Sequence, residues 1–381
     1  MIRKDRLIKT FIELAGIPGL SRKEGQIANE IARRLNQLGV KVQFDRGLAE
    51  GGETGNLIGY LNGNSFAPPL LLNAHLDTVG PMENYGFRRA GNCLLSKGKS
   101  ILGADDRSGV AVILEVLEHL KESRPRHPGL EIVFTVAEEV GLLGAKNLDY
   151  SILRARHGIV LDSDSPLEPI IAAPEAYRLI FKVLGKTAHA GVSPERGINA
   201  IQIASRAISK IKLGRIDFET TANLGIIRGG TATNIVPDLV EVRGEARSHN
   251  RKKLKAQIAR MRSHFQKAVK QARSRKFKGR PRLEEEIIFD YPLMKIPHHH
   301  FLLKLIRKAG KELGKEIAPK VGGGGSDANI FNAHKIESII LGSGMQQVHT
   351  VEEKLNLDRL YLSAQMLAKI VELYPALSKR K

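Results

Sequence analysis

The residues best suited to chemistry in this chain are histidines and carboxylates that flank short apolar segments. They are His75 and Asp77, Asp105 and Asp106, Glu138 and Glu139, Asp162 and Asp164, and His349. A carboxylate at the end of a buried strand is costly unless it is paired, protonated or bound to a cation. Two imidazoles with several carboxylates suit a pair of divalent metal ions, and these ligands favour Zn²⁺ or a neighbouring transition metal.

The strand and helix patterns that would position these residues alternate over the first 150 residues. Buried strands are predicted at 56–61, 70–73, 130–136 and 159–161, with another at 338–341. A helix is predicted to begin near Asp106, because apolar residues then recur at helical spacing. This alternation indicates an α/β sheet covered by helices, and such sheets place their sites beyond the carboxyl ends of their strands.

Each motif taken alone also has a purely structural interpretation. Asp105 or Asp106 is well placed to cap the helix that follows, and a histidine near an aspartate is often only a structural pair. Ser21 followed by Glu24 matches the capping box that begins many helices. The sequence contains no Walker lysine loop, Gly-x-Ser-x-Gly elbow or Rossmann glycine pattern. The metal-site interpretation therefore depends on the whole set.

The pattern of elements changes after Pro174. Strands are predicted at 177–184, 238–246 and 283–289, and helices at 197–213 and 252–272. These elements suit an α+β domain of ordinary size inserted into the first one. We therefore predict a catalytic domain in two parts, residues 1–174 and 291–381, with an inserted domain at 175–290.

The motifs resemble, in their order along the chain, the co-catalytic dizinc exopeptidase family. That family includes peptidase T, carboxypeptidase G, aminoacylase and acetylornithine deacetylase, and the peptidase T-like branch is the most similar. The resemblance covers nearly the whole chain and includes further motifs, namely Gly185-Lys-Thr-Ala-His-Ala-Gly191, Thr233-Asn-Ile-Val-Pro237, Gly244-Glu-Ala-Arg-Ser248 and Gly323-Gly-Gly-Ser-Asp327. It implies a central mixed sheet flanked by helices, and an inserted lid and dimerisation domain.

The resemblance also implies a ligand set for two divalent ions, with zinc favoured over cobalt or manganese. Asp105 would bridge the ions. His75 and Asp162 would complete the coordination of one ion, and Glu139 and His349 that of the other.

Further roles follow from the same resemblance. Asp77 would hold the imidazole of the first metal-binding histidine, and Glu138 would be the general base. His189, in the inserted domain, would help stabilise the oxyanion, often from the partner subunit of a homodimer. Asn234 and Arg247 would contact the backbone or carboxylate of the substrate.

Positive charge is concentrated in one part of the chain. The net charge is +20, and the stretch from Arg251 to Arg282 holds fourteen Lys and Arg residues without Asp or Glu. An apolar stripe, Leu254, Ile258, Met261, Phe265 and Ala268, predicts an amphipathic helix whose other face is basic and solvated. The alternative is a surface that binds anionic polymers. Because aromatic residues for base stacking are nearly absent there, specific nucleic-acid binding is not expected.

Location and activity complete the expectations. No apolar run reaches the ~18–20 residues of a membrane helix, and the single cysteine, Cys93, fits a reducing compartment, so we expect a cytoplasmic protein. Asp5, Lys9 and Glu13 would interrupt a secretory signal. The expected function is a metal-dependent aminopeptidase or tripeptidase acting on short peptides. The alternatives are an N-acyl-amino-acid deacylase, a carboxypeptidase of the same family, or an anionic-polymer-binding protein.

Overall fold

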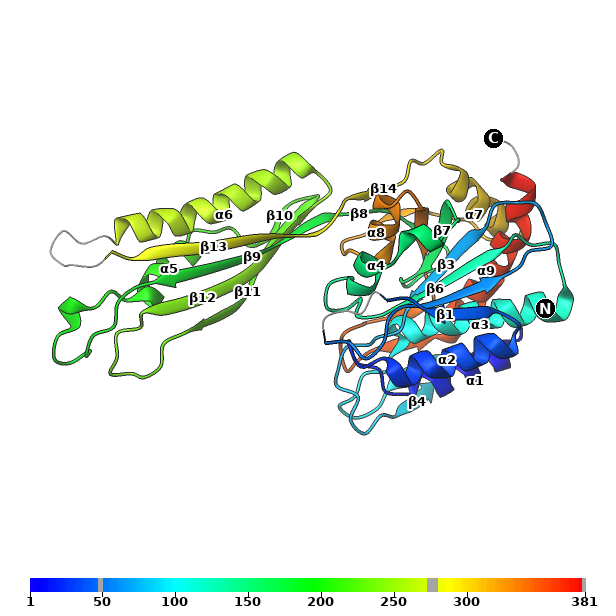
Figure 1. Ribbon diagram of the computed structural model, residues 1–381, viewed down its shortest axis with the longest axis horizontal. Helices are drawn as coiled ribbons and strands as arrows, with labels where there is room; N and C mark the ends of the chain where they lie inside the picture. The colour runs from blue at the N-terminus through cyan, green and yellow to red at the C-terminus, as the bar shows by residue number, and fades with distance from the viewer. Residues whose placement is uncertain (47–50, 273–279, 379–381) are drawn as a thin grey trace. The chain divides into compact units, whose positions relative to one another are not determined.

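The chain forms two compact units in the computed structural model, which describes residues 1–46, 51–272 and 280–378 (Figure 1). Unit 1 comprises Met1–Ala173 and the chain from Met294 onward, and unit 2 comprises Pro174–Leu293. The predicted boundaries, after residues 174 and 290, lie close to these. The predicted fold class, a split α/β domain with an inserted α+β domain, is confirmed.

A nine-stranded mixed sheet forms the centre of unit 1. Its main path runs β1-β2-β6-β3-β7-β16-β8-β14, and β15 pairs with β8. The four strands β6, β3, β7 and β16 are parallel neighbours, so their carboxyl ends lie at one edge of the sheet. The strands are β1 (Lys41–Phe44), β2 (Leu57–Leu61), β3 (Leu70–His75), β6 (Leu130–Thr135), β7 (His157–Leu161), β8 (Ile170–Ala173), β14 (Met294–Lys295), β15 (Lys320–Val321) and β16 (Glu337–Leu341).

Seven α-helices belong to the described part of unit 1. They are α1 (Lys4–Ala15), α2 (Gly25–Gln37), α3 (Ala104–Ser123), α4 (Leu143–Asn147), α7 (Phe301–Glu312), α8 (Asp327–Ala333) and α9 (Leu357–Leu377), and a 3₁₀ turn spans Tyr150–Ile152. α3 packs against β3 and against α1 and α9, whereas α8 packs against β7 and β16. Every residue of β3 and β6 is buried, and most of these residues are apolar, as in parallel strands covered on both faces.

A small sheet adds the final strands of unit 1. Its order is β17-β18-β5-β4, with β4 (Phe87–Ala90), β5 (Cys93–Ser96), β17 (Met345–Gln346) and β18 (Lys354–Asn356). Gln346 lies opposite Lys354 in this sheet, so the two side chains share one face. The segment between β17 and β18 carries His349.

Unit 2 is a five-stranded antiparallel sheet with two helices packed on it (Figure 1). The strand order is β10-β11-β12-β9-β13, with β9 (Glu175–Leu184), β10 (Gly214–Asp217), β11 (Thr220–Gly229), β12 (Leu239–Ser248) and β13 (Arg282–Tyr291). The helices are α5 (Ala200–Ile208) and α6 (Arg251–Gln271), with a 3₁₀ turn at Pro194–Arg196. Strands β10 and β11 were not predicted, because β11 is mostly exposed and lacks apolar alternation.

The basic stretch begins as the predicted amphipathic helix. In α6 all five residues of the apolar stripe are buried, and Phe265 stacks on Phe181 of β9 with ring centroids 4.2 Å apart. Three of the basic residues form ion pairs, namely Arg251 with Glu175, Lys253 with Glu219, and Arg262 with Glu285. Residues 273–279 of the stretch lie outside the described residues. Among the described residues, no helix is long and apolar enough to span a membrane.

Candidate metal centre and active site

Three of the five predicted metal ligands lie at or just after the carboxyl ends of neighbouring parallel strands. His75 is the last residue of β3, and Asp162 directly follows β7. Glu138 and Glu139 come three and four residues after the end of β6. The parallel register of β6, β3 and β7 therefore gathers side chains from separate parts of the sequence at one edge of the sheet.

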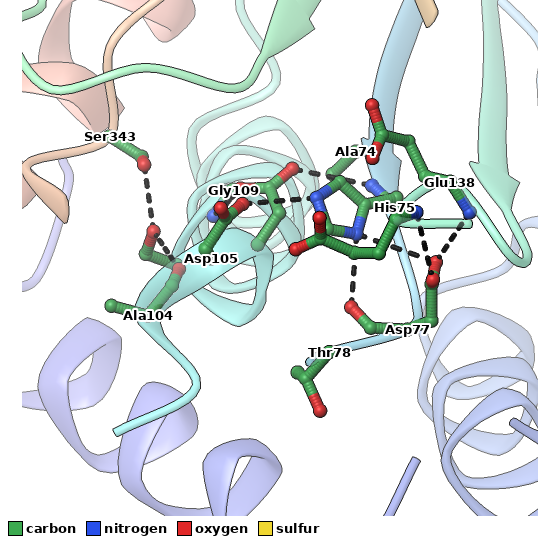
Figure 2. Close-up of polar contacts among 12 residues, drawn as sticks. Ala74, His75, Asp77, Thr78, Ala104, Asp105, Gly109, Glu138 and Ser343 are labelled. Carbon is green, nitrogen blue, oxygen red and sulfur yellow. Dashed lines mark hydrogen bonds and ion pairs between the residues drawn. The ribbon is translucent and has the colours of Figure 1, made fainter. Parts of the chain in front are cut away.

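Asp105 lies at the centre of this group. One carboxylate oxygen is 3.0 Å from Nε2 of His75, and the other is 3.1 Å from Nε2 of His349. Nε2 of His349 is also 2.9 Å from a carboxylate oxygen of Glu139. Figure 2 shows His75 between Asp105 and Asp77. One carboxylate thus faces two imidazoles through its two oxygens, which is the arrangement of a bridging ligand.

The start of α3 gives the neighbouring carboxylates of Asp105 and Asp106 different partners. Asp105 and Asp106 do not have helical backbone angles. Asp106 Oδ1 accepts a hydrogen bond from the amide of Gly109, and its Oδ2 accepts the amide of His75 at 3.3 Å. Asp106 therefore caps the regular part of the helix. A Cβ on Gly109 would lie 2.4 Å from Oδ1 of Asp106, so only glycine allows this contact.

Glu353 holds the backbone at Asp105 and was not predicted as a site residue. Its carboxylate accepts hydrogen bonds from the amides of Leu102, Gly103 and Asp105, at 2.8, 2.8 and 3.0 Å. Burial raises the pKa of Glu353 to about 7, although these amide hydrogen bonds act in the opposite direction. Its position four residues after His349 is the only signal in the sequence that could have indicated it.

Asp77 contacts His75 mainly through its main chain. Nδ1 of His75 lies 2.9 Å from the carbonyl oxygen of Asp77 and 3.5 Å from its carboxylate. That carboxylate instead accepts the amide of Glu138 at 2.9 Å (Figure 2). It also accepts the amide of Glu139 at 3.1 Å and the hydroxyl of Ser21 at 2.7 Å. Asp77 thus orients the imidazole and also fixes the backbone that carries both glutamates.

The electrostatics of the group reflect buried carboxylates close to one another. Burial and then the negative charge of Asp105 raise the pKa of Asp162 well above its usual range. Burial, followed by the charge of Asp162, likewise raises the pKa of Glu138. Burial opposes ionisation of Asp105, but hydrogen bonds to His349 and His75 outweigh it and hold the pKa of Asp105 low. Contacts with Asp105 and Glu139 raise the pKa of His349 to about 10.

A cavity of about 550 Å³ opens beside the metal-ligand candidates. Asp105, Asp162 and His349 form one part of its lining, and Gly322–Gly325, Gln346 and Lys354 form another. Asp162 therefore faces the same space as Asp105, although it makes no hydrogen bond to the other candidates in the described structure. Gly322–Gly325 contribute only backbone to this part of the lining.

The three remaining candidates belong to unit 2. His189 pairs with Ile235 across a β-bridge, and the amide of Ala190 donates to the carbonyl oxygen of Asn234 at 2.9 Å, so His189 and Asn234 are neighbours. Nδ1 of His189 accepts the amides of Gly191 and Val192, both at 3.2 Å, which places the proton of the neutral ring on Nε2. Arg247, on β12, binds Glu245 at 2.7 Å.

Comparison with known proteins identifies the family. Residues 71–373 match the family model described as peptidase family M20/M25/M40. The chain belongs to this family. It is 39% identical over 374 residues to the uncharacterized protein YqjE of Bacillus subtilis, covering 98% of this chain and 99% of that one.

Two solved structures share the fold over the whole chain. A tripeptidase from Staphylococcus aureus has a TM-score of 0.91 at 35% identity, with 99% of this chain and 100% of that chain covered. The aminopeptidase PepT of Bacillus cereus has a TM-score of 0.86 at 36% identity, covering 98% and 99%. This M20 chain is a metal-dependent peptide hydrolase, and the prediction of the family from the sequence is confirmed.

The side-chain donor atoms of this group fit a divalent cation. One ligand atom from each of His75, Asp105 and Glu139 lies within 4.8 Å of the other two. Imidazole and carboxylate are the ligands of catalytic zinc sites, and His75 and Asp105 are buried, so a cation here would compensate the gathered negative charge.

Proposed function

We propose that this protein is an aminopeptidase that removes N-terminal residues from short, unblocked peptides. The observation that carries the proposal is the Asp105 carboxylate, which faces an imidazole on each side through its two oxygens. Such a carboxylate suits two cations held close together. The similarity to a tripeptidase and to the aminopeptidase PepT, each over nearly the whole chain, supports short peptides as substrates.

We assign the metal ligands as the family resemblance implies. Asp105 would bridge two ions, with His75 and Asp162 holding one ion and Glu139 and His349 the other. Zinc is the proposed metal, with cobalt or manganese as substitutes, because the donors are imidazole and carboxylate. When bound, such ions lower the pKa of a shared water and polarise the scissile carbonyl.

Glu138 is the proposed general base. It is 8% exposed, lies beside the ligand Glu139, and its carboxylate accepts no hydrogen bond from the described residues. A free carboxylate at this position can take a proton from the attacking water and deliver it to the leaving amine.

The residues of unit 2 are proposed to act on the substrate. Nε2 of His189 carries the proton that an oxyanion donor needs, because Nδ1 accepts two amides. Asn234, its neighbour, would contact the peptide backbone. Arg247 forms an ion pair with Glu245, so it would hold the substrate carboxylate only by binding both carboxylates at once or by breaking that ion pair. We also propose that unit 2 is a lid and forms a homodimer, and that the protein is cytoplasmic.

The free α-amino group provides the test. Kinetics would be measured with a good tripeptide substrate, its N-acetylated form and its C-terminal amide. We expect cleavage of the free peptide, near loss of cleavage after acetylation, and a smaller loss after amidation. Equal cleavage of the acetylated peptide would contradict the aminopeptidase and favour the carboxypeptidase or the deacylase. No hydrolysis of any peptide or acyl-amino acid by the metal-loaded enzyme would reject the enzymatic function.

A further inference from the structure

The segment that carries Glu138 is held in place by its own backbone amides. From Val136 to Glu139, four successive amides each donate to a buried side chain from elsewhere in unit 1. The bonds are Val136 to Asn56 at 3.1 Å, Ala137 to Glu24 at 2.9 Å, and Glu138 and Glu139 to the two oxygens of Asp77 at 2.9 and 3.1 Å. Since the Glu138 carboxylate accepts no hydrogen bond from any residue that the structure describes, these amide contacts determine where it lies.

One point of this segment requires such support. Ala137 has a φ of 51°, in the left-handed region that a residue with a Cβ disfavours. Its amide is the one that Glu24 accepts. Glu24 therefore holds the residue whose conformation is least favourable by itself, directly before Glu138.

Two carboxylates hold this segment, those of Glu24 and Asp77, and Ser21 binds the second of them. Glu24 is fully buried, and its Oε1 also accepts the amide of Arg22 at 2.7 Å. The Ser21 hydroxyl donates to Asp77 at 2.7 Å. Neither side chain caps α2, whose first residue is Gly25, so the predicted capping box is wrong. Instead, Glu24 binds the amide of Ala137, and Ser21 binds the carboxylate of Asp77, beside the metal-ligand candidates.

A buried cation lies close to this arrangement. Arg107 is fully buried, and a Cβ on Gly19 would lie 2.3 Å from its Nη2, so the guanidinium lies against the segment that leads to Ser21. Burial lowers the pKa of Arg107 to about 10, while the negative charges of Asp77 and Glu24 act in the opposite direction. The two buried carboxylates therefore have a countercharge, which buried carboxylates need.

We propose that Glu24 and Ser21 are positioning residues of the reaction, holding residues 136–139 so that the Glu138 carboxylate faces the metal-binding group. The proposal rests on the proposed function in one respect, namely that Glu138 is the base. Glu24 acts directly on the amide of Ala137, and Ser21 acts through Asp77. Nothing in the geometry requires either side chain to touch a metal ion or the substrate.

The test compares Glu24→Ala with Glu24→Gln in the metal-loaded enzyme. Glu24→Ala removes the acceptor, and we expect kcat to fall about 10–100-fold, since small misplacements of a catalytic group cost up to about this much. KM and metal content should stay unchanged, and amide exchange at residues 137–139 should become faster. Glu24→Gln keeps an acceptor oxygen and should recover most of the lost activity.

Glu131→Ala is the matched control. Glu131 is also buried and accepts two backbone amides, those of Arg154 and Ala155, but it lies near the start of β6, at the far end from Glu138. The Glu131→Ala variant should have lower thermal stability but no specific loss of kcat. If Glu24→Ala does not fold, Ser21→Ala carries the test, because it removes a single hydrogen bond and should lower kcat in the same direction.

An unchanged kcat in Glu24→Ala, or equal losses in the Glu24 and Glu131 variants, would overturn the positioning role. Failure of this inference is distinguishable from failure of the proposed function. An active Glu138→Gln enzyme would reject Glu138 as the base. An inactive Glu138→Gln enzyme together with a fully active Glu24→Ala enzyme would reject only the positioning role.

Discussion

Replacing Glu138 by glutamine is the most direct perturbation of the proposed chemistry. The substitution keeps the size of the side chain but removes its ability to accept a proton. The backbone contacts that place residue 138 do not involve the side chain, since its amide donates to Asp77 and its carbonyl accepts the amide of Leu142 at 2.7 Å. The fold and the metal-ligand set should therefore survive.

The expected loss of activity follows from the role of the carboxylate. General acid–base catalysis typically contributes about 10²–10⁴-fold to a rate, which corresponds to about 2.7–5.4 kcal/mol of transition-state stabilisation. The loss should appear in kcat. Metal content should not fall, because the side chain of residue 138 is not a proposed ligand. The free energy of unfolding should hold or rise, because the variant no longer buries an ionisable group at 8% exposure.

The assay combines tripeptide kinetics with metal analysis and thermal unfolding of the same preparation. Glu131→Gln, a substitution of the same type on β6, is the control and should keep near wild-type kcat. A Glu138→Gln enzyme with two bound ions and wild-type turnover would refute the assignment of the base. Loss of activity together with loss of metal would refute the claim that Glu138 is not needed for metal binding.

Three further outcomes are expected. Asp105→Ala should abolish binding of both ions, because its two oxygens face His75 and His349; two ions per chain in metal analysis would contradict the bridge. Metal affinity should rise with pH, because the pKa of His349, raised to about 10, means that a proton occupies this imidazole in the metal-free protein at neutral pH and must leave when metal binds. Calorimetry in buffers of different ionisation enthalpy would measure that release, and a pH-independent affinity would contradict it. His189→Ala should lower kcat by roughly 10²–10³-fold with unchanged metal content, and a wild-type kcat would leave His189 as an ordinary surface residue.

Much of the fold could be predicted because apolar periodicity is a local signal. The run that became β3 and the stripe of α6 each identify their element without knowledge of its neighbours. Strand β11 could not be predicted, since its side chains are mostly exposed and its place is set by pairing with β12. Pairing with a distant strand does not require an alternating apolar pattern in the sequence of an exposed strand.

The sequence by itself determined the chemical types at the site and, through the family resemblance, their assignment. His75, Asp105, Glu139 and His349 could be named in advance, because metal-binding side chains after apolar runs form a recognisable series. For His75 and Glu139 the convergence follows from the parallel order of β3 and β6, which an α/β pattern implies. Asp105, at the start of α3, and His349, between β17 and β18, are brought to the same place by the tertiary structure.

Only the tertiary structure decided which polar residues support that site. Asp105 and Asp106 are adjacent and chemically identical, yet Asp105 faces the imidazoles of His75 and His349, whereas Asp106 accepts the backbone amides of Gly109 and His75. Ser21 and Glu24 match a helix cap in sequence, yet they bind segments more than fifty residues away. A hydrogen bond depends on atoms within about 3 Å of each other, and the folded chain, rather than spacing along the sequence, determines which atoms meet at that distance.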